Sequence, residues 1–143
     1  MTIAVREARD DAERAAAMAI RRAVFVDEQD VPLELELDGR DDDAVHLVAV
    51  RDGEVVATCR LLGRGAMVHL GRLAVDAGAR RQGIAALLLR AAETWAREHG
   101  AQRLALSAQT YTAALYAGAG YATVGEPYME AGIEHVDMEL ELA

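Results

Sequence analysis

A basic turn that carries one glycine, Arg80-Arg81-Gln82-Gly83-Ile84-Ala85, stands between a short apolar run and a strongly helical run. The unpaired N–H groups at the start of a helix, together with the positive end of its dipole, bind anions such as phosphate. Gly83 lets the backbone approach a ligand closely, and the small side chain of Ala85 leaves the first helical turn unobstructed. The turn is therefore a candidate phosphate-binding site.

Two common phosphate-binding motifs do not match this turn. A Walker loop needs a Lys next to Ser or Thr, and the chain contains no Lys. A dinucleotide fingerprint needs three glycines in a G-x-G-x-x-G frame, whereas the turn has only Gly83. The remaining pattern, [Arg/Gln]-x-x-Gly-x-[Gly/Ala] after a strand, resembles the pyrophosphate-binding loop of the GNAT superfamily of N-acetyltransferases, which bind acetyl-coenzyme A.

Two further stretches extend the resemblance over nearly the whole chain. Residues 109–121 read Q-T-Y-T-A-A-L-Y-A-G-A-G-Y and resemble the GNAT pattern Asn-x-x-Ala-x-x-x-Tyr-x-x-x-Gly-[Phe/Tyr], with Gln109 in place of the usual Asn. Near the start, Arg21-Arg22-Ala23-Val24-Phe25-Val26-Asp27-Glu28-Gln29 is similar to a small bacterial branch of the superfamily, as is Gly132-Ile133-Glu134-His135 near the end. The chain is thereby identified as a member of the GNAT superfamily.

The resemblance assigns roles to particular residues. It implies that the backbone of Leu73, Ala74 and Val75 pairs with the pantetheine arm of coenzyme A as an added strand would, with the Leu73 amide facing the thioester oxygen. It also implies that Gln109 contacts the cofactor and that the pyrophosphate is held by Arg80, Arg81, Gln82, Gly83, Ile84 and Ala85.

Tyr116 matches the GNAT position that commonly protonates the departing thiolate. A phenol, with a pKa of ~10, stays protonated at pH 7 and can donate that proton. The alternative is a half-buried tyrosine whose hydroxyl only touches the cofactor. We favour the acid role.

A base is the other chemical requirement, because only about 0.1% of a lysine-like amine is neutral at pH 7. His69 lies on the strand where many GNAT enzymes place a carboxylate base, and a neutral His is suited to removing a proton directly or through water. The alternative is a strand histidine that faces solvent or a backbone carbonyl. Glu28 is the fallback base, and its alternative role is that of a loop carboxylate capping nearby amides.

Other polar residues are given structural interpretations. We expect His46 and His135 to make structural hydrogen bonds at strand starts, and Arg72 to be a surface charge rather than a substrate contact. Gly71 is a candidate for the bulge that opens the cofactor cleft. The four histidines are widely spaced, so we expect no metal site. Cys59 lies away from both motifs, which favours direct attack over an acyl-enzyme intermediate.

Length and charge restrict the class of protein. With 143 residues and 15.4 kDa, the chain is long enough for one domain with a buried core, expected over residues 1–143. A net charge of −9 argues against nucleic-acid binding. The longest apolar run, residues 84–89, is too short to span a bilayer, and the early charges leave no apolar export segment. A single cysteine excludes an internal disulfide, so we expect a cytoplasmic protein.

The elements that must position these residues follow from periodicity and turn residues. We expect an α/β (mixed α+β) fold with a mixed, mostly antiparallel central sheet flanked by helices, in which the strands 67–75 and 103–107 splay apart to hold coenzyme A. A long acidic segment, residues 27–43, is expected to be irregular, with Asp41-Asp42-Asp43 as a polar loop. The expected strands are 2–7, 45–51, 54–62, 67–75, 103–107, 121–125 and 135–142, and the expected helices are 10–26, 83–99 and 110–117.

The preferred function is N-acetyl transfer from acetyl-coenzyme A to a primary amine of a small molecule or peptide. One alternative is a non-catalytic acyl-coenzyme A sensor. It stays open because Gln109 replaces the Asn of the family pattern and because the base is unassigned. A less favoured alternative is chemistry like that of acyl-homoserine-lactone synthases. Tyr128 and Met129 are expected to line the acceptor pocket or a dimer contact, since GNAT proteins often dimerise and the resemblance leaves a homodimer open.

Overall fold

The computed structural model describes residues 2–142, which form one mixed sheet of seven strands with helices on both faces. The strands are β1 (Ile3–Glu7), β2 (Val45–Arg51), β3 (Glu54–Leu62), β4 (Met67–Val75), β5 (Arg103–Gln109), β6 (Ala122–Glu130) and β7 (Ile133–Glu141). The α-helices are α1 (Asp11–Arg21), α2 (Leu33–Glu36), α3 (Ile84–Glu98) and α4 (Ala113–Gly118). A π-helical segment, η1 (Arg22–Glu28), and the short 3-10 turns η2 (Asp41–Asp43), η3 (Ala77–Ala79) and η4 (Thr110–Thr112) complete the chain.

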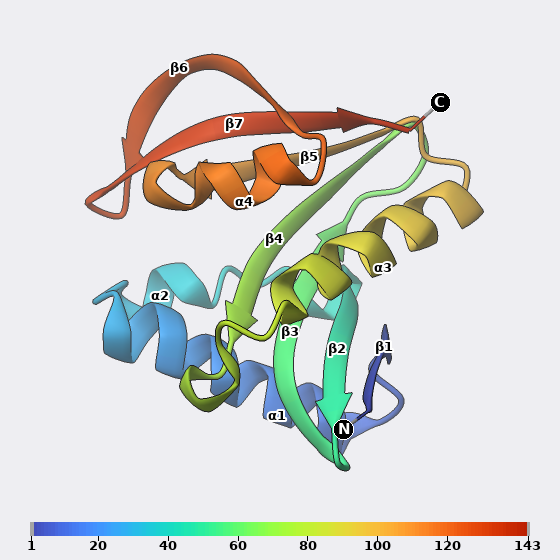
Figure 1. Cartoon of the computed structure of the whole chain (residues 1–143). Coiled ribbons are helices and arrows are strands. Elements are labelled where there is room, and N and C mark those ends of the chain that lie inside the picture. The colour runs from blue at the N-terminus through green and yellow to red at the C-terminus, as the bar shows by residue number, and fades with distance from the viewer. Residues whose placement is uncertain (1, 143) are drawn as a thin grey trace.

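The sheet has the strand order β1-β2-β3-β4-β5-β7-β6, and only β4 and β5 run parallel. Those two strands pair through Met67, Val68 and His69 of β4 alone, opposite Arg103, Leu104 and Ala105. Beyond these pairs the strands diverge, so that β4 descends away from β5 and β7 (Figure 1). The expected mixed, mostly antiparallel sheet with a splay between these strands is confirmed.

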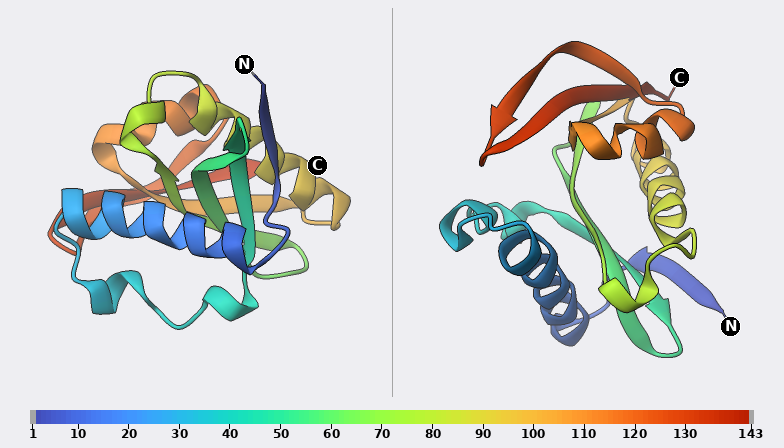
Figure 2. Two further views of the ribbon diagram at one scale, coloured as in Figure 1. Left: turned by 90° about the horizontal axis from the view of Figure 1, so that it is seen from below. Right: turned by 60° about the vertical axis from the view of Figure 1, so that its left-hand side comes forward.

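Helices cover the two faces of the sheet. The helix α1 packs on β3 and β4, whereas α3 packs on the opposite face, as the right-hand view of Figure 2 shows. Four of the five buried α3 side chains, Ile84, Leu88, Ala92 and Ala96, recur every four residues and so share one face of the helix, and Leu89 is the fifth. The short turn η3 and the basic turn separate the end of β4 from the N-terminus of α3.

The first helix differs from its expected form near its C-terminus. Asp10 caps α1 by accepting a hydrogen bond from the Glu13 amide at 2.9 Å. The α-helical hydrogen bonding ends at Arg21, and the chain continues as the π-helical η1 to Glu28. Ile20 and Val24 still pack together on Ala74 of β4, so the wider turn keeps the apolar contact.

The acidic segment is more ordered than the sequence indicates. Pro32 stands at the N-cap of α2, where its fixed φ suits the entry to a helix, and the Leu35 and Glu36 amides donate to its carbonyl. The expectation of an irregular segment was therefore wrong for residues 33–36. In the C-terminal hairpin, β6 continues to Glu130 past an irregularity between Val124 and Tyr128, well beyond the expected end at Gly125.

The bulge expected at Gly71 lies one residue further along β4. Thr58 pairs with Ala74 and Arg60 pairs with Gly71, so Cys59 of β3 stands opposite two residues, Arg72 and Leu73. Arg72 has a φ of 53°, in the left-handed region, whereas Gly71 does not. The extra residue bends β4 next to the segment that diverges from β5.

Candidate functional site

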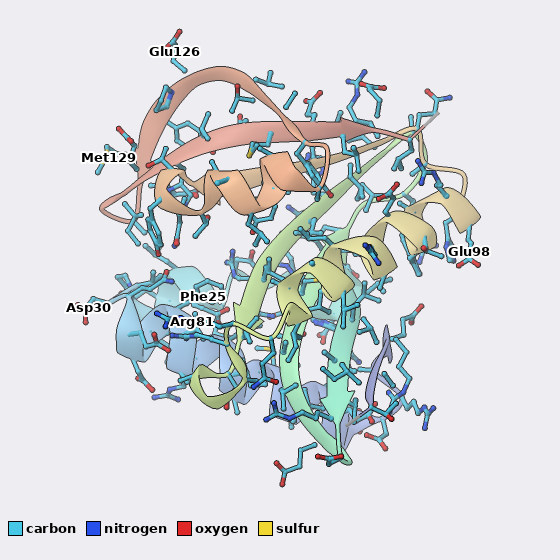
Figure 3. All side chains as sticks on the ribbon, viewed as in Figure 1. Phe25, Asp30, Arg81, Glu98, Glu126 and Met129 are labelled. Atoms are coloured by element: carbon cyan, nitrogen blue, oxygen red, sulfur yellow. The ribbon has the colours of Figure 1, made fainter. Side chains whose placement is uncertain are left out.

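A cleft of about 1310 Å³ lies where β4 and β5 diverge, and it gathers nearly all of the predicted site residues. Figure 3 places Phe25 and Arg81, which both line it, below the opening, and Met129 above it. Its walls include Glu28, His69, Leu73, Ala74, Val75, Arg80, Arg81, Gly83, Ile84, Ala85, Gln109 and Tyr116. Gln82 is the exception, since its side chain accepts a hydrogen bond from Arg51 at 2.6 Å on the outer side of the turn.

The basic turn has the backbone geometry of an anion site. Arg81 and Gly83 both have left-handed φ values, 63° and 77°, which reverse the chain just before α3. Gly83 is the N-cap, and no side chain caps the first turn of α3. The N–H groups of that turn are therefore left without a side-chain acceptor, and the positive end of a fifteen-residue helix lies at the cleft.

Arg80 is held by a carboxylate and by the end of β4. Its Nη1 and Nη2 donate to Glu28 Oε2 and Oε1 at 3.0 and 2.6 Å, and its Nε donates to the Val75 carbonyl at 3.2 Å. The hydrogen bonds from Arg80 lower the pKa of Glu28. While this pair is intact, Glu28 is a weaker base than an unpaired glutamate.

Tyr116 extends from α4 to the floor of the cleft. Its side chain is 8% exposed and packs edge-to-face on Tyr121, with ring centroids 6.0 Å apart. Burial raises the pKa of Tyr116 above that of a free phenol. The hydroxyl is therefore protonated at neutral pH, as a proton donor must be.

His69 occupies the last pairing position before the strands separate. It is exposed and stands opposite Ala105, which pairs on its other side with Glu139 of β7. His69 and Glu139 thus share one row of the sheet, about 10 Å apart across two strand spacings, with a small alanine between them. Both line the cleft.

Two further polar residues on the same wall, Ser107 and Asp137, were missed from the sequence. Ser107 and Asp137 pair across β5 and β7 and both line the cleft. Tyr128 joins them, because its hydroxyl is hydrogen-bonded to Ser107 and donates to Asp137 Oδ1 at 2.6 Å. Burial and the Asp137 contact raise the pKa of Tyr128. The strict alternation of β7 places Asp137 on a polar face, but it does not tell a solvent face from a cleft wall.

Gln109 is hydrogen-bonded to the N-terminal half of the chain. Its Nε2 donates to Gln29 Oε1 at 2.6 Å, and Gln29 follows directly after η1. This hydrogen bond ties the end of β5 to the N-terminal half of the chain, and both residues line the cleft.

A buried ion network lies next to α2 on one side of the cleft. Arg21 and Glu36, 1% and 2% exposed, pair at 2.7 Å, and Arg21 also pairs with Asp41. Arg60 makes two 2.8 Å hydrogen bonds with Asp38. The expectation that Arg72 is a surface charge was wrong, since it lies within 3.4 Å of both Glu36 and Asp38. The expected solvated loop at residues 41–43 likewise has Asp41 turned inward, because the acidic segment folds back over β3 and β4.

The remaining titratable candidates have structural contacts. His46 Nε2 donates to the Asp41 carbonyl at 2.9 Å, and His135 Nδ1 donates to the Ile133 carbonyl at 2.7 Å, as expected for structural histidines. Cys59 is buried outside the cleft lining, and burial raises its pKa to about 12.

Within residues 2–142, no three His, Cys, Asp or Glu side chains are grouped so as to hold a metal ion. None of the helices in this part of the chain has the length and apolar character needed to cross a membrane.

Comparison with known proteins gives one consistent result. The family model of the acetyltransferase (GNAT) domain matches residues 9–142. The uncharacterized N-acetyltransferase YjcF of Bacillus subtilis is 35% identical over 124 residues, which cover 85% of this chain and 88% of that protein. An acyl-CoA N-acyltransferase from Pseudomonas aeruginosa is 33% identical, with a TM-score of 0.83 over 97% of this chain and 98% of that one.

A GNAT family acetyltransferase from Elizabethkingia anophelis, solved with acetyl-CoA bound, superposes with a TM-score of 0.75. The match covers 98% of each chain at 17% identity, so it shows the shared fold alone. The splayed sheet, the basic turn at the start of α3 and the match over residues 9–142 agree, and this chain belongs to the GNAT acetyltransferase family, a family of acyltransferase enzymes.

Proposed function

We propose that this protein transfers the acetyl group of acetyl-coenzyme A to a primary amine of a small molecule or peptide by direct attack within a ternary complex. The observation that carries the proposal is the cleft between β4 and β5, which has an anion site at one end and titratable side chains on its walls. Membership of an acetyltransferase family supports the same reaction class.

The cofactor would lie along β4. Between His69 and the end of the strand, β4 has no pairing with β5, so its edge is available to the amide groups of a pantetheine arm. The diphosphate would then reach the N–H groups of Gly83 and Ile84 and the guanidinium groups of Arg80 and Arg81. A Cβ atom at position 83 would not contact any neighbouring atom. Glycine is favoured there because the φ is left-handed.

The reaction would proceed by addition of the amine to the thioester and then elimination of the thiolate. The lone pair of the amine nitrogen attacks the thioester carbonyl carbon, and the oxyanion that forms accepts a hydrogen bond from the Leu73 N–H. Collapse of this intermediate breaks the C–S bond, and the thiolate takes a proton from Tyr116. His69 takes the proton that the ammonium group loses before the attack, directly or through water, and the proton that the nitrogen loses on collapse restores the Tyr116 hydroxyl.

We prefer His69 to Glu28 as the base. Glu28 stands at Arg80, beside the proposed phosphate site, rather than at the end of the β4–β5 pairing. His69 stands where the two strands separate, on the wall that also holds Ser107, Asp137 and Glu139. The acidic residues on that wall favour an acceptor that carries positive charge before it loses its proton.

Turnover against a panel of primary amines tests the proposal. Release of free coenzyme A thiol is followed with amines, amino acids and peptides as acceptors, and acetylated products are identified by mass. Acceptor-dependent thiol release that Tyr116→Phe reduces at unchanged cofactor affinity supports the reaction. Tight acetyl-coenzyme A binding with no turnover on any acceptor would instead favour the sensor alternative, for which the comparisons give no support.

A further inference from the structure

The bulge in β4 has an unexpected residue at its strained position. Arg72 takes the left-handed conformation with a φ of 53°. That region is costly for a residue with a side chain and nearly free for glycine. Gly71 is its immediate neighbour and does not take this conformation. An arginine at this position therefore requires a compensating interaction from its side chain.

The Arg72 side chain supplies that interaction by crossing from β4 to α2. Its Nη2 donates to the main-chain carbonyls of Leu35 and Glu36 at 3.2 and 3.1 Å. The same nitrogen lies 3.4 Å from Asp38 Oδ2. Its Nε lies 3.3 Å from Glu36 Oε1, without the geometry of a hydrogen bond. The guanidinium thus holds the C-terminal end of α2 against the bulge.

The groups that Arg72 contacts are themselves fixed. Glu36 is buried and bound by Arg21 of α1, and Asp38 is bound through both oxygens by Arg60 of β3. Arg60 also pairs through its main chain with Gly71. The side chain of Arg72 therefore connects the bulge to a rigid anchor made of α1, α2 and β3.

Arg72 adds little to the ion network itself. Arg21 and Arg60 already engage Glu36, Asp38 and Asp41 through close contacts of 2.7 to 3.2 Å. Burial, and then the charge of Arg60, lower the pKa of Arg72. Ion pairing can be achieved from an unstrained backbone, so it does not by itself explain the left-handed conformation of Arg72.

We infer that Arg72 is a positioning residue: by joining the β4 bulge to α2, it fixes the peptide plane that directs the Leu73 amide toward the thioester oxygen. The inference rests on the proposed function, because it assumes that acetyl-coenzyme A lies along β4. It also links the wall formed by α2, which lines the cleft through Leu35 and Glu36, to the reacting carbonyl. An acceptor that displaces α2 would thereby change the geometry at the thioester.

Amide chemical shifts test this inference without knowledge of the acceptor. The ¹⁵N-labelled protein is titrated with coenzyme A and with acetyl-coenzyme A, which share the diphosphate but differ in the thioester carbonyl. In the wild type, the Gly83 and Ile84 amides should shift with both ligands, and Leu73 should shift further with acetyl-coenzyme A. In Arg72→Gln, the difference at Leu73 should be lost while the shifts of Gly83 and Ile84 persist.

Two further variants separate positioning from folding. Arg72→Gly removes the side chain but suits the left-handed backbone, so it should fold even if the glutamine variant does not, and it should also lose the Leu73 difference. Arg90→Gln is the matched control, an exposed arginine on α3 outside the cleft lining, and should behave as the wild type.

Several results would overturn the inference. A Leu73 difference that persists in both Arg72 variants, or that is absent from the wild type, contradicts it while leaving cofactor binding intact. Failure of both variants to fold would assign Arg72 a structural role. If the Gly83 and Ile84 amide chemical shifts do not change in the wild type, both the proposed function and this inference are contradicted.

Discussion

The guanidinium of Arg80 and the carboxylate of Glu28 face each other through paired hydrogen bonds that join the phosphate turn to η1. Their side chains are 40% and 43% exposed, so the pair lies at the mouth of the cleft and not within it. The proposed diphosphate of coenzyme A needs the same guanidinium. Cofactor binding and the ion pair would therefore compete, and cofactor binding would release Glu28.

Removing the competing carboxylate should tighten cofactor binding. We expect Glu28→Gln to lower the dissociation constant of acetyl-coenzyme A by up to about fivefold, the range expected for loss of an exposed ion pair. Calorimetric titration measures this constant. Glu34→Gln, an exposed change on α2 at the same net charge, is the control. A weaker or unchanged affinity in Glu28→Gln would show that the two interactions do not compete.

Loss of the Tyr116 hydroxyl should affect chemistry and spare binding. The Tyr116→Phe variant keeps the buried ring and its edge-to-face contact with Tyr121, so Tm should change little. We expect kcat to fall about 100-fold, the lower range for loss of a general acid, at nearly unchanged acetyl-coenzyme A affinity. Retention of the wild-type kcat would exclude the acid role and leave Tyr116 as a packing residue.

Removal of the His69 imidazole should change the pH–rate profile. We expect His69→Gln to lower kcat/KM about 100-fold and to move the acidic limb of that profile to higher pH, because the reaction then depends on the fraction of the acceptor amine that is already unprotonated. His99→Gln serves as the control, since His99 stacks on Trp95 at the far end of α3. An unchanged acidic limb in His69→Gln would favour Glu28 as the base, or a reaction without a protein base.

The buried Arg21–Glu36 pair should dominate the effect of mutation on stability. Glu36→Gln removes one of the two carboxylates that pair at 2.7 Å with a 1% exposed arginine, and loss of one partner of a buried pair costs about 3–5 kcal/mol. Chemical denaturation measures this change in the free energy of unfolding. The same substitution at exposed Glu126 should have almost no effect. Similar values for the two variants would contradict a stabilising role for the pair.

Acid should weaken the fold through the Asp38 carboxylate. Hydrogen bonds from Arg60 lower the pKa of Asp38 in the folded state. A lowered folded-state pKa contributes stability above the pKa of the unfolded chain, ~3.9, and this contribution is lost as the pH falls toward the folded value. The Asp38→Asn variant should therefore lose less stability than the wild type between pH 5 and pH 2. An identical acid dependence would show that other carboxylates determine it.

The sequence predicted the sheet and the basic turn at the start of α3 because their signals are local. The four-residue recurrence in α3, the glycine at its start and the Asp-Gly hairpin turn at Asp52 and Gly53 each depend on neighbouring residues. The basic turn and the Tyr116 stretch also resemble family motifs of fixed spacing. Such features can be recognised without knowledge of the tertiary structure.

The other walls of the cleft were harder to predict because their contacts are long-range. Arg72 meets the α2 carbonyls 36 and 37 positions away in sequence, and Ser107 meets Tyr128 21 positions away. Nothing local distinguishes Arg72 from a surface arginine. The left-handed conformation also falls on Arg72 instead of Gly71, against local preference, because contacts with α2 compensate for it.

Thermal unfolding with and without acetyl-coenzyme A tests the central claim most directly, because it requires no acceptor. A ligand at ~100 times its Kd adds about 2.7 kcal/mol of stability, so the wild type should show a clear rise in Tm. An Arg81→Glu/Gly83→Glu variant that still folds should lose this rise, whereas Arg90→Glu, which reverses one exposed charge on α3 outside the cleft lining, should keep it. No rise for the wild type at millimolar acetyl-coenzyme A would contradict cofactor binding in the β4–β5 cleft.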